Sequence, residues 1–162
     1  MQRGIHAFII AAFAATVAAG AFAAPDPPPD PDKDKDKKLE QARAAIAAED
    51  WARAQEVLRK ALQHDPGKAE YHNLYAYSIR KGDRPAMDLV FRHYNEALRL
   101  RPAHLGAHEY LGEAYLMLDQ PQRAVEHLAR LDQLCTFGCR EYRQLKTAIA
   151  NYKKGVKPQA SR

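Results

Sequence analysis

The chain has 162 residues, with 25 Lys and Arg against 20 Asp and Glu and a formal net charge of +5 at pH 7. This length accommodates one domain with appended segments. Basic residues are interspersed with acidic ones rather than gathered on one expected face, which argues against nucleic acid as a partner.

Residues 1–23 have the pattern of a secretory signal peptide. Arg3 supplies the positive charge, residues 7–19 form an uncharged apolar run, and Ala21 and Ala23 provide the small residues that a signal peptidase requires. We therefore expect cleavage after Ala23 and a periplasmic protein with no stable membrane insertion. An uncleaved anchor is the alternative, because a run of about 18 apolar residues can just cross a bilayer.

Residues 24–38 are expected to form a disordered linker. The segment combines Pro with Asp and then Lys with Asp, and it contains no large apolar side chain to bury. Such a composition favours extended, solvated conformations. The linker is either a plain spacer or a stalk that holds the folded part away from a membrane or assembly surface.

Six segments follow in which apolar residues recur with the 3.6-residue period of an α-helix. We expect helices at about 37–48, 51–64, 69–81, 84–100, 105–118 and 120–134. Pro66 and Gly67 end the second of them, since proline cannot continue a helix. No stretch alternates apolar and polar residues with period two, so the predicted fold class is all-α.

The six segments form three pairs that repeat one pattern of small and large residues. In the third pair the pattern is carried by Leu111, Gly112, Tyr115, Ala124 and Leu128. The first two pairs have matching residues, and both finish with the same helix end, Ala-Leu-x-x-x-Pro, at 61–66 and 97–102. Three correlated units make the pattern far more specific than one would be.

This pattern resembles the tetratricopeptide repeat (TPR) family, whose unit is a helix-turn-helix of about 34 residues. The resemblance covers residues 35–134 and implies a right-handed superhelix of about three units. A helix pair cannot bury its apolar face by itself, so the last unit needs a cap. Residues 141–154 form an amphipathic helix suited to that role. We therefore expect a TPR domain at 39–155 and a flexible tail at 156–162.

Cys135 and Cys139 lie where the third unit ends and the cap begins. In an exported protein, two cysteines that flank a glycine-containing turn can come within disulfide range, and a bridge here would contribute about 2 kcal/mol. Cys-x-x-x-Cys also resembles the thiol spacing of exported copper-insertion proteins, and thiolates select Cu(I). Those proteins use a thioredoxin-like fold, whereas a helical one is expected here. Free or intermolecular thiols are a further alternative.

Four histidines recur at matching positions of successive units, His72 with His108 and His93 with His127. Recurrence of this kind is typical of packing positions, whereas a metal site needs side chains that converge. His104 lies four residues before His108 but precedes the expected helix. We predict no metal and no cofactor. Because no nucleophile elbow, phosphate-binding loop or His-Glu-x-x-His motif is present, we also predict no enzyme activity.

The TPR resemblance implies where a partner binds, because in that family the first helix of each unit lines a concave groove that holds an extended peptide or a partner's helix. By helical phase this groove would present Arg43, Asn73, Tyr77, Arg80, Glu109, Tyr110 and Glu113. Ordinary solvated faces are the alternative, with both tyrosines partly in the core. The two glutamates argue against capture of a C-terminal carboxylate and favour a ligand of mixed charge.

The sequence therefore predicts a non-enzymatic periplasmic adaptor, a monomer or weak homodimer, that binds a protein or peptide in its groove. The alternative is a periplasmic protein that handles copper or thiol redox chemistry through Cys135 and Cys139.

Overall fold

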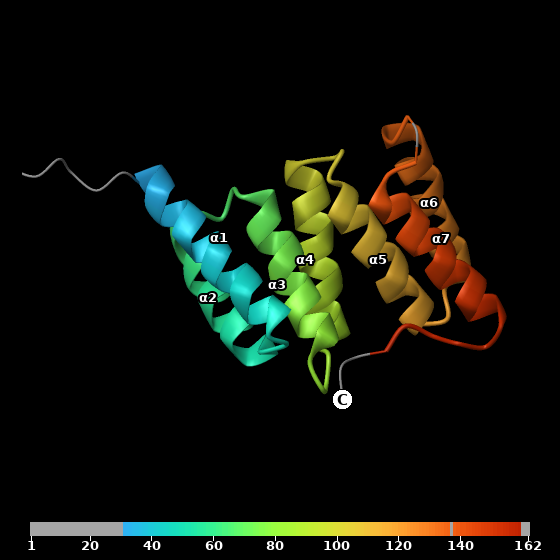
Figure 1. Ribbon diagram of the computed structural model, residues 1–162, viewed down its shortest axis with the longest axis horizontal. Coiled ribbons are helices and arrows are strands. Elements are labelled where there is room, and N and C mark those ends of the chain that lie inside the picture. The colour runs from blue at the N-terminus through green and yellow to red at the C-terminus, as the bar shows by residue number, and fades with distance from the viewer. Residues whose placement is uncertain (1–30, 137, 160–162) are drawn as a thin grey trace, which may run out of the picture.

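The computed structural model describes residues 31–136 and 138–159, with side chains from residue 37 onward. The described residues form seven α-helices and no strand, which confirms the all-α fold class (Figure 1). The helices are α1 (Pro31–Ala47), α2 (Trp51–His64), α3 (Ala69–Lys81), α4 (Met87–Leu100), α5 (Leu105–Met117), α6 (Pro121–Leu134) and α7 (Arg140–Lys153). The expected signal peptide at 1–23 lies outside the described residues.

Local sequence explains where several helices begin. The Asp50 carboxylate caps α2 by accepting a hydrogen bond from the Arg53 N–H at 2.9 Å. Pro121 is the first residue of α6. Proline is tolerated there because the backbone N–H groups of the first turn have no hydrogen-bond partner within the helix. Helix α4 begins at Met87, three residues later than expected, and Pro85 explains part of this difference, because it disfavours the helical conformation in Arg84. Helix α1 begins at Pro31, inside the segment expected to be a linker.

Consecutive helices run antiparallel and pack against one another (Figure 1). The odd-numbered helices also contact each other in order, α1 with α3, α3 with α5 and α5 with α7. Each even-numbered helix packs against the two odd-numbered helices on either side of it. The odd-numbered helices are therefore the shared elements of the stack.

Three apolar cores hold this stack together. One combines residues of α1, α2 and α3, the next α3, α4 and α5, and the last α5, α6 and α7. Each core mixes alanines, which let helices approach closely, with fully buried larger side chains such as Leu58, Tyr94 and Leu131. Burying each such side chain contributes about 1.5–3 kcal/mol. Because α3 and α5 each serve two cores, neither can move without disturbing both.

Two turns have the same unusual backbone conformation. Glu49 after α1 and Asp119 after α5 have φ values of 54° and 57°, in the left-handed region. In both turns the next N–H reaches back five residues, from Asp50 to Ala45 O and from Gln120 to Tyr115 O, each at 2.9 Å. This pattern closes a helix end by satisfying its last carbonyls. The first and third helix pairs are thus joined in the same way.

Gly112 of α5 allows the close approach of α7. A Cβ at this position would lie 2.6 and 2.7 Å from the two δ carbons of Leu145, which is fully buried. Because Leu145 is fully buried against Gly112, the missing side chain at 112 sets how near α7 can lie to α5.

We predict that Gly112→Ala lowers the free energy of unfolding by about 1–2 kcal/mol, because overpacking a core costs about 1–3 kcal/mol and the better helix propensity of alanine returns up to about 1. Urea unfolding followed by circular dichroism measures the change. Gly67→Ala is the control, since a Cβ there meets Asp65 Oδ1 at an ordinary 3.7 Å. An unchanged or raised stability of Gly112→Ala would contradict the close contact.

Candidate functional site

The groove residues predicted from the sequence lie on three odd-numbered helices. Arg43 is on α1, three are on α3 and three are on α5. The structure brings together four of them, Tyr77, Arg80, Tyr110 and Glu113, at the contact between α3 and α5. These four residues are called the α3–α5 cluster below.

Arg80 is the centre of the α3–α5 cluster and is 1% exposed. Its guanidinium donates to Glu113 Oε2 at 2.7 Å and, more weakly, to the Tyr94 hydroxyl at 3.4 Å. Burial opposes the charge, but Tyr94 and Glu113 outweigh it, so the pKa of Arg80 is raised. Arg80 therefore stays a cation inside the protein and ties α3 to α5.

The two tyrosines of the cluster form a half-buried aromatic surface. The ring centroids of Tyr77 and Tyr110 are 4.5 Å apart, and Trp51 of α2 meets the Tyr77 ring edge-on at 6.0 Å. The Arg80 guanidinium carbon lies 5.5 and 5.8 Å from the two tyrosine centroids, within the range of a cation–π contact. Burial raises the pKa of both phenols, so they remain neutral hydroxyl donors. Trp51 was missed as a member of this surface because it lies on an even-numbered helix.

Asn73 and Glu109 occupy equivalent positions on α3 and α5, 36 residues apart. Both are buried, at 3% and 2% exposed, and neither Asn73 Oδ1 nor Glu109 Oε2 has a hydrogen-bond partner among the described residues. Burial, together with the nearby Glu113 carboxylate, raises the pKa of Glu109 to about 8. The two positions therefore hold buried polar oxygens whose hydrogen-bonding capacity is unused among the described residues, and the raised pKa leaves the Glu109 carboxyl largely protonated at pH 7.

Arg43 belongs to a different charge cluster. It is exposed, and its guanidinium pairs with Glu70 Oε1 at 3.0 Å. Glu70 Oε2 also lies 3.0 Å from His104 Nε2, at the start of α5, and 3.5 Å from Arg101, at the end of α4. His104, with Arg43, holds the pKa of Glu70 at about 2. Glu70 of α3 thus links α1 to the turn between α4 and α5, and Arg43 is one of its ion-pair partners.

The recurring histidines form two pairs with the same geometry. His72 Nδ1 lies 2.8 Å from His93 Nδ1, and His108 Nδ1 lies 2.9 Å from His127 Nδ1. His72 Nε2 donates to the Pro66 carbonyl at 2.9 Å, and His108 Nε2 donates to the Pro102 carbonyl at the same distance. A neutral ring has one N–H, so in each pair the α4 or α6 histidine donates to the other. Packing, as expected, accounts for their recurrence.

These pairs make stability depend on pH. Burial, and then the neighbouring histidine, lowers the pKa of His93 and of His127 to about 4. Because the folded pKa lies below the unfolded value of about 6.5, the unfolded state binds more protons between these values. The stabilisation is therefore complete above pH 6.5 and is lost as the pH falls toward 4.

We predict that the double variant His93→Asn with His127→Asn loses less stability between pH 7 and pH 4.5 than the unmodified chain. The asparagine amide can still donate the hydrogen bond. The difference from the unmodified chain should be about 1–2 kcal/mol per histidine, because the half-exposed rings are partly screened. Urea unfolding at each pH measures it. Glu109 acts with the opposite sign, but both proteins share it, so the comparison removes its effect. Equal pH dependence in the two proteins would contradict the assignment.

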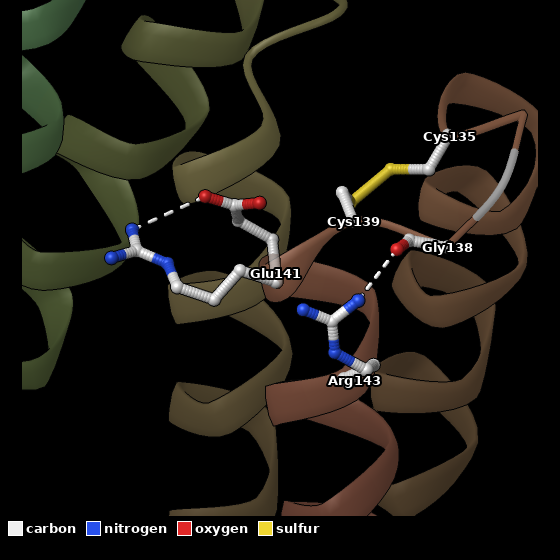
Figure 2. The surroundings of a disulfide bond; sticks show 6 residues. Cys135, Gly138, Cys139, Glu141 and Arg143 are labelled. Atoms are coloured by element: carbon white, nitrogen blue, oxygen red, sulfur yellow. Dashed lines mark hydrogen bonds and ion pairs between the residues drawn. A yellow bond between two sulfur atoms is a disulfide. The ribbon is translucent and has the colours of Figure 1, made fainter.

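The structure contains the expected Cys135–Cys139 disulfide, with Cα atoms 5.5 Å apart (Figure 2). The bridge spans the turn between α6 and α7. Arg143 donates to the Gly138 carbonyl at 2.7 Å across the same turn, and Gly138 has a positive φ of 74°. Since the two sulfurs are bonded to each other, a copper or thiol role would first require reduction of the bridge.

A cavity of about 440 Å³ adjoins the α3–α5 cluster. Glu113 lines it from α5, and Arg140, Gln144 and Thr147 line it from α7. The remaining wall is formed by residues 156–158, part of the segment expected to be a flexible tail. The cavity thus lies between two helices of the odd-numbered layer and the chain end.

A scan against protein-family models and a search of curated proteins found no match to this chain. Within residues 31–136 and 138–159, no three histidine, cysteine or acidic side chains converge as a metal site would require. None of the described helices is both long enough and apolar enough to cross a membrane.

We predict that Arg80→Met lowers the free energy of unfolding by about 3 kcal/mol, because it leaves Glu113 and the Tyr94 hydroxyl without their buried partner. Glu113→Gln should cost less, since its side chain is 22% exposed. The double variant should be more stable than the sum of the two changes predicts, by at least about 1 kcal/mol. Urea unfolding of the unmodified chain, the two single variants and the double variant completes this double-mutant cycle. Additive effects on the free energy of unfolding would show that the pair is not coupled.

Proposed function

We propose that this chain is an exported, non-enzymatic adaptor of the TPR type, which binds a segment of another protein on the layer formed by the odd-numbered helices. The units are α1 with α2, α3 with α4 and α5 with α6, and α7 is the cap. Export and the absence of catalysis rest on the sequence pattern, whereas the arrangement of the units has further support in the structure.

Repetition at the level of atoms supports the unit boundaries. The histidine pairs and their proline partners recur with offsets close to the unit length of the TPR pattern. The matching turns at Glu49 and Asp119 place the same helix end in the first and third units. The packing order, in which each unit contacts its sequence neighbours, is that of a repeat stack.

The observation that carries the binding role is the pair of half-buried tyrosine rings at the contact between α3 and α5, in the layer of odd-numbered helices. Tyr77 and Tyr110 offer a large contact area that loses little side-chain entropy on binding. A protein segment supplies the complement, apolar side chains that pack on the rings.

Site-specific photocrosslinking in the full-length exported chain tests this proposal. A photoreactive phenylalanine analogue at Tyr77 or Tyr110 should crosslink one common partner. The same analogue at Arg59 of α2 or Arg130 of α6, both exposed on even-numbered helices, should not. With that partner purified, Tyr77→Ala and Tyr110→Ala should each weaken binding at least about 10-fold, as is typical of central aromatic contacts.

Circular dichroism and thermal unfolding of the two alanine variants are the control for folding. Crosslinks that are as strong from α2 and α6 as from α3 and α5, or partner binding that folded alanine variants leave unchanged, would refute the proposed surface.

A further inference from the structure

The chain turns back on itself after α7. Gly155 has a φ of 85°, and its N–H donates to Tyr152 O at 2.9 Å while the N–H of Val156 donates to Asn151 O at 3.0 Å. This is a helix end closed by a left-handed glycine. Figure 1 shows the consequence, because the following residues run from the end of α7 past the end of α5 toward the turn between α3 and α4.

The returning segment, residues 156–159, is anchored at Asp119. The Lys157 ammonium lies 2.6 Å from Asp119 Oδ2, and the Tyr152 hydroxyl of α7 donates to Oδ1 at 2.9 Å. Lys157 is the main cause of the lowered pKa of Asp119. Asp119 is the residue whose positive φ closes α5, so its carboxylate is presented at a fixed place on the end of that helix.

The segment also reaches α3, a second odd-numbered helix of the proposed binding layer. Lys81, the last residue of α3, approaches the Gln159 carbonyl with its ammonium at 3.5 Å. Val156, Lys157 and Pro158 form one wall of the cavity that Glu113 and α7 line. The segment therefore lies across the ends of α7, α5 and α3 as a short extended peptide.

The contacts of the segment are of the kind that exchange readily. Val156 is 59% exposed, and both members of the Lys157–Asp119 pair are largely exposed. Exposed ion pairs contribute little to stability, since water competes for both charges. A tethered segment can nevertheless occupy its site most of the time, because the tether gives it a high effective concentration.

We propose that residues 156–159 are an internal ligand of the binding layer, and that the partner presents an extended segment whose basic side chain replaces Lys157 at Asp119. This inference rests on the proposed function and specifies the partner's chemistry. The partner's segment would take the path of the tail, with its cation at Asp119 and a backbone carbonyl near Lys81. Displacement of the tail would open the cavity beside Glu113 to the partner.

A peptide with the sequence of residues 155–162, carrying a fluorophore, tests the proposal on the full-length chain. The unmodified chain should bind this peptide weakly, because its own segment holds the site. Lys157→Ala frees the site while keeping Asp119, so the peptide should bind this variant about 10-fold more tightly. Adding Asp119→Asn to Lys157→Ala should abolish that gain. Asparagine tolerates the left-handed backbone of position 119, so the turn is retained.

Two controls give the experiment its specificity. Asp132→Asn, at an exposed acidic position on α6, should leave peptide binding to the Lys157→Ala chain unchanged. A peptide in which the lysine is alanine should fail to bind. Equal binding of the peptide to the unmodified and Lys157→Ala chains, or equal binding of the lysine and alanine peptides, would overturn the internal ligand. Neither result would affect the crosslinking test, which probes Tyr77 and Tyr110 and does not involve Asp119.

Discussion

The buried charge of Arg80 is the constraint on which the middle of the molecule depends. A guanidinium taken out of water must keep its partners, and the principal one, Glu113, lies on the next odd-numbered helix. The relative position of α3 and α5 is therefore coupled to a hydrogen bond as well as to apolar packing. The same guanidinium lies over the rings of Tyr77 and Tyr110, so the ion pair that joins two units also positions their aromatic surface. Stability and the proposed recognition surface share one set of atoms.

The histidine pairs within units differ in chemistry from two of the contacts between units. Each histidine pair joins the two helices of one unit and uses a neutral hydrogen bond, which low pH disrupts. Two polar contacts between units are ionic, Arg80 with Glu113 and Arg43 with Glu70. Glu70 has a pKa far below the range in which the histidines titrate. Acidification toward pH 4 should therefore loosen the units internally before it breaks the ionic links between them.

Helical periodicity and the positions of Pro and Gly predict that each described helix exists, because these signals are local, but they did not predict that α1 begins at Pro31. The bounds of α2 and α3 agree with expectation, and α4 differs where Pro85 acts on its neighbour. Helical phase also placed Tyr77 and Arg80 on one face. It could not reveal that Arg80 is buried, because its partner is 33 residues away on a different helix. The histidine pairs and the contact of Lys157 with Asp119 were hidden for the same reason, since long-range pairing leaves no periodic trace.

Helix α7 is held at three places along its length, and this bears on how the tail can leave its site. The disulfide fixes its N-terminal end, Leu145 packs against Gly112 in the middle, and Tyr152 bonds to Asp119 near its C-terminal end. None of these contacts uses residues 156–159. Release of the tail therefore leaves α7 and the Asp119 carboxylate in place, because Tyr152 continues to orient Oδ1 when the lysine departs from Oδ2. An incoming cation would meet a site that is already formed, and binding would require little rearrangement of the helices.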